Sequence, residues 1–410
     1  MAKPPHTPLL SLEETWARLL TGLSAITEHE RLPLAESSYR VLAEPLLASI
    51  NVPGFDNSAM DGYAFCSRDL ASGTRELPIG LRVAAGDAPS ALPPGTACRI
   101  FTGAPLPVGA DTVVIQEDCE TRGDTLIVPP QWTIGAHIRR AGEDIRAGDT
   151  ILEKGRRLNA QAIGLAASCG FSEVRVYRRA RVVLLSTGDE LREAGNEPLR
   201  DGQIYDSNRP MLKALLRRMG CEVESLGPIG DDLEATRAAL RRAASQADLI
   251  VTTGGVSVGE EDHVKTALEK EGALALWRVA IKPGKPLAFG HIGRAHFLGL
   301  PGNPVSSFVT FLLFVRPFLV ALEGETPRPP IRFPVYAGFM RAEGDKRREF
   351  LRARLKVRAD GELEASSYAQ QSSGVLSSVA WADGLVDLPA DTPVAVGDRV
   401  LFLPFEGLLP

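Results

Sequence analysis

The sequence predicts a multidomain α/β protein with a mostly parallel sheet at its centre. Strand-like and helix-like segments alternate from Arg179 onward, which indicates βαβ units around a parallel sheet. The regions before and after this part contain short β-type runs separated by Gly and Pro. The chain has 410 residues, and at roughly 100–200 residues per domain it is expected to hold two to four domains.

Composition and charge are those of a soluble globular protein. Apolar residues make up 44% and charged residues 24% of the chain, so a core of normal size is expected. The net charge of −5 argues against a nucleic-acid partner, because nucleic-acid-binding domains are usually basic. Five dispersed cysteines without a Cys-x-x-Cys pair predict neither a disulfide framework nor a zinc site, and they favour a cytoplasmic location.

The apolar segments do not predict a membrane partner. Residues 1–10 contain one Lys and three prolines without a long apolar stretch, so no signal peptide is expected there. The most apolar segment, Phe308–Leu322, is interrupted by Arg316 and Pro317 and is shorter than the roughly 20 residues of a membrane span. It is predicted to be a buried helix.

The N-terminal part, up to about Asn51, is predicted to be helical. Ser11 is followed by two acidic residues, the pattern of an N-cap and the first turn of a helix. Leu12, Trp16 and Leu19 then recur at helical spacing.

Two β-rich regions are predicted on either side of the α/β part. The first extends from Asn51 to about Arg140, and the second follows the stiff, proline-rich connector Glu323–Pro330. The strand-like runs are Thr112–Ile115 and Thr125–Val128 in the first region, and Phe350–Val357 and Arg399–Leu403 in the second.

The α/β part itself shows recognisable strand and helix boundaries. Capping residues, an early proline and a terminal glycine mark the helix ends. The predicted elements are the strand Arg181–Leu185, a helix capped by Ser207 or Asn208 with Pro210 in its first turn and ended by Gly220, a helix opened by Asp231 and Asp232, the strand Asp248–Val251, and the helix His263–Lys270.

A glycine-rich loop, Thr252–Gly259, follows the strand Asp248–Val251. Glycines let backbone N–H groups approach phosphate oxygens closely, and ligands of parallel sheets bind at the carboxyl ends of the strands. No Gly-Lys-Ser/Thr follows, so this is not a Walker loop. The acidic run Glu260–Asp262 follows instead and indicates Mg²⁺, which takes oxygen ligands and bridges to phosphates. The alternative is a plain tight turn after a strand.

The segment Lys282–Pro286 holds two lysines in a short turn with two prolines and a glycine. Because these residues restrict the backbone, both ammonium groups are expected near one point, which suits a compact oxyanion. The alternative is a solvated basic turn.

Other polar positions leave the choice between structure and function open. Asn303, followed by Pro304, is a natural helix cap, and an anion site at the same helix end is compatible with that role. The segment Asp56–Ala64 combines carboxylates, an amide and a glycine, although Asp and Asn also form turns. Taken singly, Asp144 and Glu190 are better explained as surface charges. The six histidines show no metal-ligand spacing, and no Ser/His/Asp order is evident.

Together these segments resemble the molybdopterin molybdenumtransferase family, the MoeA-like enzymes related to the E domain of gephyrin. One such motif would be weak, but here many occur in the family's order over nearly the whole chain. The matching segments are Phe55–Ala64, Ile100–Pro105, Gly142–Asp144, Ser186–Leu191, Thr252–Gly259, Lys282–Pro286, Leu300–Pro304, Arg348–Arg352 and Ser373–Ser378.

The resemblance implies four domains. Residues 1–50 and 145–178 would form an elongated helical dimerisation domain, 51–144 an inserted β-rich domain, 179–326 the molybdopterin-binding α/β domain, and 327–410 a C-terminal β-barrel. It further implies a homodimer, with a cleft between the α/β domain of one subunit and the inserted domain of the other. Contact with the molybdopterin adenylyltransferase is another partnership the resemblance allows.

The implied reaction converts adenylylated molybdopterin and molybdate into molybdenum cofactor and AMP, with Mg²⁺ as cofactor. The family's functional polar positions around the diphosphate and metal match Asp61, Thr102, Asp144, Glu190 and Asp262, with Asp61, Glu190 and Asp262 as metal ligands. The substrate-binding positions match Thr253, Gly254, Gly255, Ser257, Pro301, Asn303 and Asp231, whose doublet with Asp232 leaves the register open. Those near the oxyanion match Lys282, Lys285, Ser306, Arg352 and Ser373.

One departure and three alternatives accompany this interpretation. Relatives often have Gln-Gly-Ser where this chain has Gln371-Ser372-Ser373, which places a side chain beside the oxyanion pocket. The molybdopterin adenylyltransferase shares the α/β domain, but the Asp56–Ala64 segment and the C-terminal β region argue against that activity. A gephyrin-like scaffold would need a peptide groove, and none is identifiable in the sequence. Tungstate is near-isosteric with molybdate, so residue types do not separate the two.

Overall fold

The structure is a computed structural model of the chain that describes residues 9–70, 73–195, 198–230, 232–255 and 263–409. The chain divides into two compact units. Unit 1 comprises residues 1–30, 39–41 and 176–410, and unit 2 comprises residues 31–38 and 42–175. The chain passes from one unit to the other within β1 (His29–Pro33) and β12 (Glu173–Tyr177).

Unit 1 contains a six-stranded sheet in the order β16-β13-β17-β21-β20-β18. The first four strands run parallel, and β20 and β18 join antiparallel, which confirms the predicted mostly parallel sheet. The carboxyl ends of β13, β17 and β21 therefore meet at one edge. The bounds are β13 (Arg181–Thr187), β16 (Glu222–Ile229), β17 (Leu249–Thr253), β18 (Ala273–Arg278), β20 (Pro286–Ile292) and β21 (Ala295–Leu300), with the short pair β14 (Leu191–Arg192) and β15 (Ile204–Tyr205) beside them.

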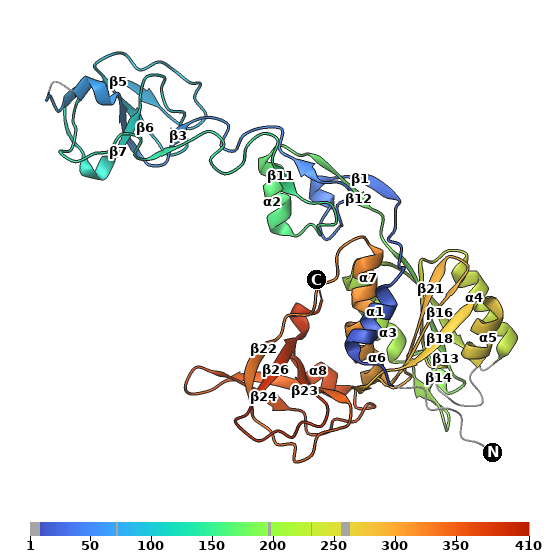
Figure 1. The fold of residues 1–410 in the computed structure, drawn as a ribbon. Coiled ribbons are helices and arrows are strands. Elements are labelled where there is room, and N and C mark those ends of the chain that lie inside the picture. Colours follow the sequence, from blue (N-terminus) through green and yellow to red (C-terminus); the bar gives the residue numbers. More distant parts are fainter. Residues whose placement is uncertain (1–8, 71–72, 196–197, 231, 256–262, 410) are drawn as a thin grey trace. The chain divides into compact units, whose positions relative to one another are not determined.

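Helices cover both faces of this sheet (Figure 1). Successive side chains of a strand point to opposite faces. Val182 and Leu184 accordingly share one core cluster with α3, α6 and α7, whereas Val183 and Leu185 share another with α4 and α5. The helix bounds are α1 (Leu12–Leu20), α3 (Asn208–Arg218), α4 (Leu233–Ala244), α5 (His263–Glu271), α6 (Pro304–Thr310) and α7 (Arg316–Leu322).

Two of the predicted helix starts are confirmed by capping hydrogen bonds, whereas Ser207 at the N-cap of α3 makes none with its side chain. Ser11 and Glu14 form a capping box, in which each side chain accepts a hydrogen bond from the other's backbone N–H, at 2.7 and 3.0 Å. The Asp232 carboxylate accepts from the N–H of Ala235 at 2.6 Å and opens α4. Asn303 occupies the N-cap of α6, although its side chain makes no capping hydrogen bond.

The prediction of a helical segment up to Asn51 is correct only for α1. After it come β1, a 3₁₀ turn at Leu34–Glu36 and the short strand β2 (Leu46–Leu47). Pro33 and Pro45 lack the backbone N–H that a helix requires at interior positions, and β2 instead pairs with β11.

The apolar segment forms a core helix, as predicted. Pro304–Leu322 is 19 residues long, and 89% of its most apolar window is buried inside the protein, which is consistent with a soluble protein. A π-helical stretch, Phe311–Val315, joins α6 to α7. Pro317 follows it and provides no N–H for the carbonyl of Leu313 four residues earlier. The indole N–H of Trp16 donates to that carbonyl instead, at 2.6 Å.

The C-terminal part of unit 1 is a five-stranded closed barrel, which confirms the predicted β-barrel. Its strands pair in the order β23-β24-β22-β26-β25, and β25 returns to β23. The small strand β19 of the α/β part pairs in parallel with β23 and joins the two parts. The bounds are β19 (Ile281–Lys282), β22 (Phe333–Ala337), β23 (Arg348–Val357), β24 (Leu363–Ser367), β25 (Gly384–Leu388), β26 (Arg399–Pro404) and α8 (Ser377–Trp381).

Unit 2 is mostly β structure. Its main sheet has the order β7-β4-β6-β5-β9-β8, with two hydrophobic clusters around Ile100 and Leu126. The predicted strands at β7 and β9 are confirmed. The bounds are β2 (Leu46–Leu47), β3 (Asn57–Ser58), β4 (Gly62–Phe65), β5 (Glu76–Val83), β6 (Ala97–Ile100), β7 (Thr112–Ile115), β8 (Glu120–Arg122), β9 (Thr125–Ile127), β10 (Ile138–Arg139), β11 (Thr150–Leu152) and α2 (Ala160–Ser168).

Candidate functional site

A cavity of about 790 Å³ lies in unit 1 at the carboxyl edge of the parallel sheet. The ends of β13 and β17, the loop after β21, the Lys282–Pro286 turn and two barrel segments line it. Of the residues predicted from the sequence, the strand ends and loops contribute Glu190, Thr253, Gly254, Gly255, Pro301 and Asn303. The Lys282–Pro286 turn, α6 and the barrel contribute Lys282, Lys285, Ser306 and Ser373. These ten predicted positions of unit 1 thus lie around one pocket and come from five separate segments.

The glycines after β17 are required by close packing. Gly254 has φ +86°, and a Cβ there would lie 2.9 Å from the carbonyl oxygen of Thr187. Gly255 has φ +64°, and a Cβ there would lie 2.4 Å from a methyl group of Val264 on α5. Only glycine fits these positions without a shift of the neighbours. The backbone can therefore form the floor of the pocket, as a phosphate cradle needs.

Asn208 lines the pocket, although its position in the sequence predicts only a helix-capping role. Its side-chain amide donates to Thr253 Oγ1 and to the carbonyl oxygen of Gly302, both at 2.7 Å. These bonds tie the end of β17 to the loop after β21. Because Asn208 is 8% exposed and lines the cavity, it fixes the distance between two pocket walls. The signal that could have identified Asn208 is its place in the chain between β13 and β17, two strands whose carboxyl ends line the pocket.

The lysine turn is attached to the barrel. Strand β19 pairs Lys282 with Glu349 of β23. The Lys282 ammonium lies 2.9 Å from a carboxylate oxygen of Asp345 and 2.9 Å from one of Glu349. Burial opposes the charged form of Lys282, but the hydrogen bonds to these carboxylates outweigh it and raise its pKa. Lys285, in contrast, lines the cavity without an ion pair among the described residues.

Arg347 also lines the cavity and was not among the predicted site residues. Its Nε and backbone N–H both donate to one oxygen of Asp345, at 3.1 and 3.0 Å. Burial alone would raise the pKa of Asp345, but bonds from Lys282 and Arg347 lower it to about 2. The sequence signal that could have identified Arg347 as a site residue is its position directly before the family-like segment Arg348–Arg352.

Arg352 lies behind the pocket wall. Its side chain is 1% exposed and donates to Ser378 Oγ at 3.1 Å and to the carbonyl oxygen of Ser372 at 3.2 Å. Gln371 adds a reciprocal pair of bonds with the Arg352 backbone. Burial lowers the pKa of Arg352 to about 10. In the described geometry Arg352 supports the segment that carries Ser372 and Ser373, both of which line the cavity.

Unit 2 brings together three of the family-like segments. The Asp61 carboxylate accepts the backbone N–H and the hydroxyl of Thr102, both at 2.8 Å. These bonds, with a smaller contribution from Arg99, lower the pKa of Asp61. Asp144, which is exposed, follows the stretch whose Arg140 pairs with Asp56 at 2.6 Å. That Asp61, Thr102 and Asp144 complete the site from the inserted domain of a second subunit stays a prediction.

Among the described residues, the pocket offers a magnesium ion one carboxylate, that of Glu190. No group of three or more His, Cys, Asp or Glu side chains could hold a metal among the residues that the structure describes. Glu190 contributes an exposed carboxylate to the pocket, close above Gly188. Mg²⁺ commonly uses one or two carboxylates and completes its shell with phosphate and water. Of the predicted positions, Asp231, Ser257 and Asp262 lie outside the described residues.

The fold and the pocket define an α/β protein with a fused β-barrel and a cation-lined cavity at the carboxyl edge of its sheet. Three family models match the chain in order: the MoeA N-terminal region, domains I and II, at residues 10–170; a probable molybdopterin binding domain at 183–321; and the MoeA C-terminal region, domain IV, at 335–405. The chain belongs to the MoeA family.

Individual relatives agree with this assignment over nearly the full length. The molybdopterin molybdenumtransferase of Haemophilus influenzae is 40% identical, and the match covers 98% of this chain and 100% of the relative. That of Synechococcus elongatus is 40% identical over 90% of this chain and 94% of its own. The crystal structure of the molybdopterin biosynthesis MoeA protein from Pyrococcus horikoshii OT3 superimposes with a TM-score of 0.81 at 27% identity, covering 97% of this chain and 100% of that one.

Proposed function

We propose that this chain is a transferase that inserts molybdate into adenylylated molybdopterin, releasing AMP and molybdenum cofactor. The observation that carries the proposal is one cavity lined both by glycine backbone and by the Lys282–Pro286 turn. Full-length relatives named molybdopterin molybdenumtransferase support it. They also weigh against the adenylyltransferase and scaffold alternatives, because the matches include the N-terminal and C-terminal regions.

The glycines and the lysine turn that line the cavity would each bind one of the two substrates. The backbone N–H of Gly255 would donate to a phosphate oxygen of the activated pterin, whereas that of Gly254 donates to the carbonyl oxygen of Leu300 at 3.2 Å. Lys285 and the third N–H of Lys282 would donate to the molybdate oxygens by charge-assisted hydrogen bonds. Ser306 and Ser373 line the same cavity and would add neutral donors. The chain's contribution is then mainly positioning and electrostatic stabilisation, without a covalent nucleophile.

Magnesium belongs to this proposal as a bound cofactor. Glu190 would hold it from the pocket, with Asp262 and, in a dimer, Asp61 as further carboxylates. The ion would offset the diphosphate charge and polarise the bond between the phosphates. Without it, the carboxylates would repel an anionic substrate. The proposal further includes the four predicted domains, a homodimer, contact with the adenylyltransferase that supplies the substrate, and a cytoplasmic location.

The test is reconstitution of the reaction with purified protein. Adenylylated molybdopterin and Mg²⁺ are incubated with molybdate, with tungstate or with neither, and AMP is measured. We expect AMP release that needs both an oxyanion and Mg²⁺, and that stops when a chelator is added. The tungstate arm determines which oxyanion the chain uses. AMP transfer from ATP onto free molybdopterin, without oxyanion dependence, would support the adenylyltransferase instead.

A further inference from the structure

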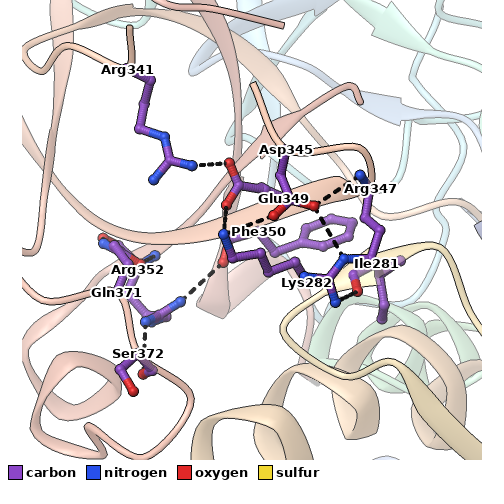
Figure 2. Close-up of polar contacts among 10 residues, drawn as sticks. All are labelled: Ile281, Lys282, Arg341, Asp345, Arg347, Glu349, Phe350, Arg352, Gln371 and Ser372. Atoms are coloured by element: carbon purple, nitrogen blue, oxygen red, sulfur yellow. Dashed lines mark hydrogen bonds and ion pairs between the residues drawn. The ribbon is translucent and has the colours of Figure 1, made fainter. Parts of the chain in front are cut away.

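Five charged side chains form an alternating series at the wall of the pocket. Figure 2 shows Arg341, Glu349, Lys282, Asp345 and Arg347 joined in that order. Glu349 uses one carboxylate oxygen for Arg341, at 2.5 Å, and the other for Lys282, at 2.9 Å. Asp345 likewise uses one oxygen for Lys282, at 2.9 Å, and the other for Arg347, at 3.1 Å. Cation and anion alternate throughout, and no carboxylate oxygen of the series lacks a donor.

Glu349 is the most buried member of the series. Its side chain is 3% exposed, against 20% for Asp345 and 37% for Lys282. A buried carboxylate is costly unless it is paired and hydrogen-bonded. Backbone pairing of β19 with β23 places Lys282 directly opposite Glu349, so the ion pair joins residues that the strands already align. Two cations of the series, Lys282 and Arg347, line the cavity.

The geometry determines what remains available on Lys282. A lysine ammonium has three N–H donors. Asp345 and Glu349 take two of them, which leaves one for a ligand in the cavity. A lysine side chain is flexible, and holding it before the ligand arrives reduces the entropy lost on binding. Two carboxylates therefore convert a mobile cation into a fixed donor.

We propose that Glu349 is a positioning residue for the oxyanion site: with Asp345, it fixes the Lys282 ammonium so that one N–H faces the bound oxyanion. This inference rests on the proposed function, because it concerns the molybdate that the pocket would take. The competing explanation is that the ion pairs only fasten the barrel to the α/β part. A second competing effect is the field of the carboxylate, which repels anions.

The three explanations predict different changes in the KM for molybdate when Glu349 is replaced. Glu349→Gln removes a negative charge beside the pocket, so the field effect alone would lower the KM for molybdate. A purely structural role would lower the melting temperature and leave this KM unchanged. Loss of positioning raises the KM for molybdate by about tenfold, the usual weight of a hydrogen bond to a charged group. The KM for adenylylated molybdopterin should stay within about twofold, because its phosphate cradle is formed by other residues of the cavity, the glycines after β17.

The matched control is Glu364→Gln. Glu364 is also a barrel carboxylate paired with a lysine, at 2.7 Å from Lys356, but it does not line the cavity. It should leave both KM values unchanged. Asp345→Asn removes the other partner of Lys282 at a more exposed position, and it should raise the KM for molybdate about threefold. If Glu349→Gln does not fold, the KM of Asp345→Asn for molybdate distinguishes the three explanations.

A double-mutant cycle completes the test. If Glu349 acts through Lys282, adding Glu349→Gln to Lys282→Met should change the KM for molybdate by less than about twofold. Additive effects, or an unchanged or lowered KM in folded Glu349→Gln and Asp345→Asn, would overturn the positioning role. Wild-type protein without oxyanion-dependent AMP release would overturn the proposed function, whereas normal wild-type turnover with unaffected variants overturns only the inference.

Discussion

Trp16 and Leu313 are joined by a hydrogen bond that compensates for a proline. The indole N–H donates to the Leu313 carbonyl, for which Pro317, four residues later, has no N–H to donate. An unpaired buried carbonyl costs on the order of 1–3 kcal/mol. Helix α1 is thereby fixed to the core helix of the α/β part by a polar contact as well as by apolar packing.

Replacing Trp16 with Phe should therefore lower the free energy of unfolding by about 1–3 kcal/mol, because ring packing remains while the donor is lost. Denaturant unfolding followed by circular dichroism measures it. Trp277→Phe is the control, since Trp277 stacks on Phe289 at 5.3 Å and should lose less than about 1 kcal/mol. Equal losses in the two variants would contradict the carbonyl argument.

Gly284 sets the shape of the lysine turn. It has φ +109°, and a Cβ there would lie 2.7 Å from Thr310 Oγ1 in the core helix. Gly284→Ala should cost roughly 1–3 kcal/mol and raise the KM for molybdate by shifting both lysines. Gly293→Ala is the matched control, because Gly293 also has a positive φ, of +58°, but no atom within 4 Å of the added Cβ. If the alanine variants behave alike, the close contact has no role.

Lys285 is expected to carry much of the oxyanion affinity. It lines the cavity and, unlike Lys282, has no carboxylate partner within the described ranges, so its charge is uncompensated. Lys285→Ala should raise the KM for molybdate by about 10- to 100-fold, the range for a lost charge-assisted hydrogen bond. AMP release at varied molybdate measures this. Lys356→Ala, on the barrel, should not change it; wild-type-like synthesis at limiting molybdate would refute the role of Lys285.

Asp61 is expected to be needed for turnover and dispensable for folding. It is held by Thr102 at the surface of unit 2, so its loss removes no core contact. Asp61→Ala should reduce AMP release by about two orders of magnitude, as for loss of an electrostatic group at a reacting centre. Asp69→Ala, which also removes a carboxylate bonded to a backbone N–H of this unit, at 3.0 Å, is the control. Unchanged turnover in Asp61→Ala with an intact melting curve would exclude the role.

Local signals in the sequence predicted most of the α/β part. Ser11 and Asp232 cap helices because their side chains reach N–H groups only three residues away. The error before Asn51 has a comparable cause: helical spacing was visible in α1, but the short strands after it are stabilised by partners far along the chain. Pairing of that kind leaves little trace in a local window.

The sequence by itself indicated the family and ten of the residues that line the pocket, because glycines that permit close backbone approach, prolines that fix φ and paired lysines are recognisable wherever they occur. Tertiary structure decided how the charges combine. Lys282 and Glu349 are 67 positions apart, and only the pairing of β19 with β23 brings them to 2.9 Å. The same folding buries Arg352 behind the wall and brings Arg347 to the cavity. Which cation meets solvent depends on strand register and burial, and these are properties of the assembled core.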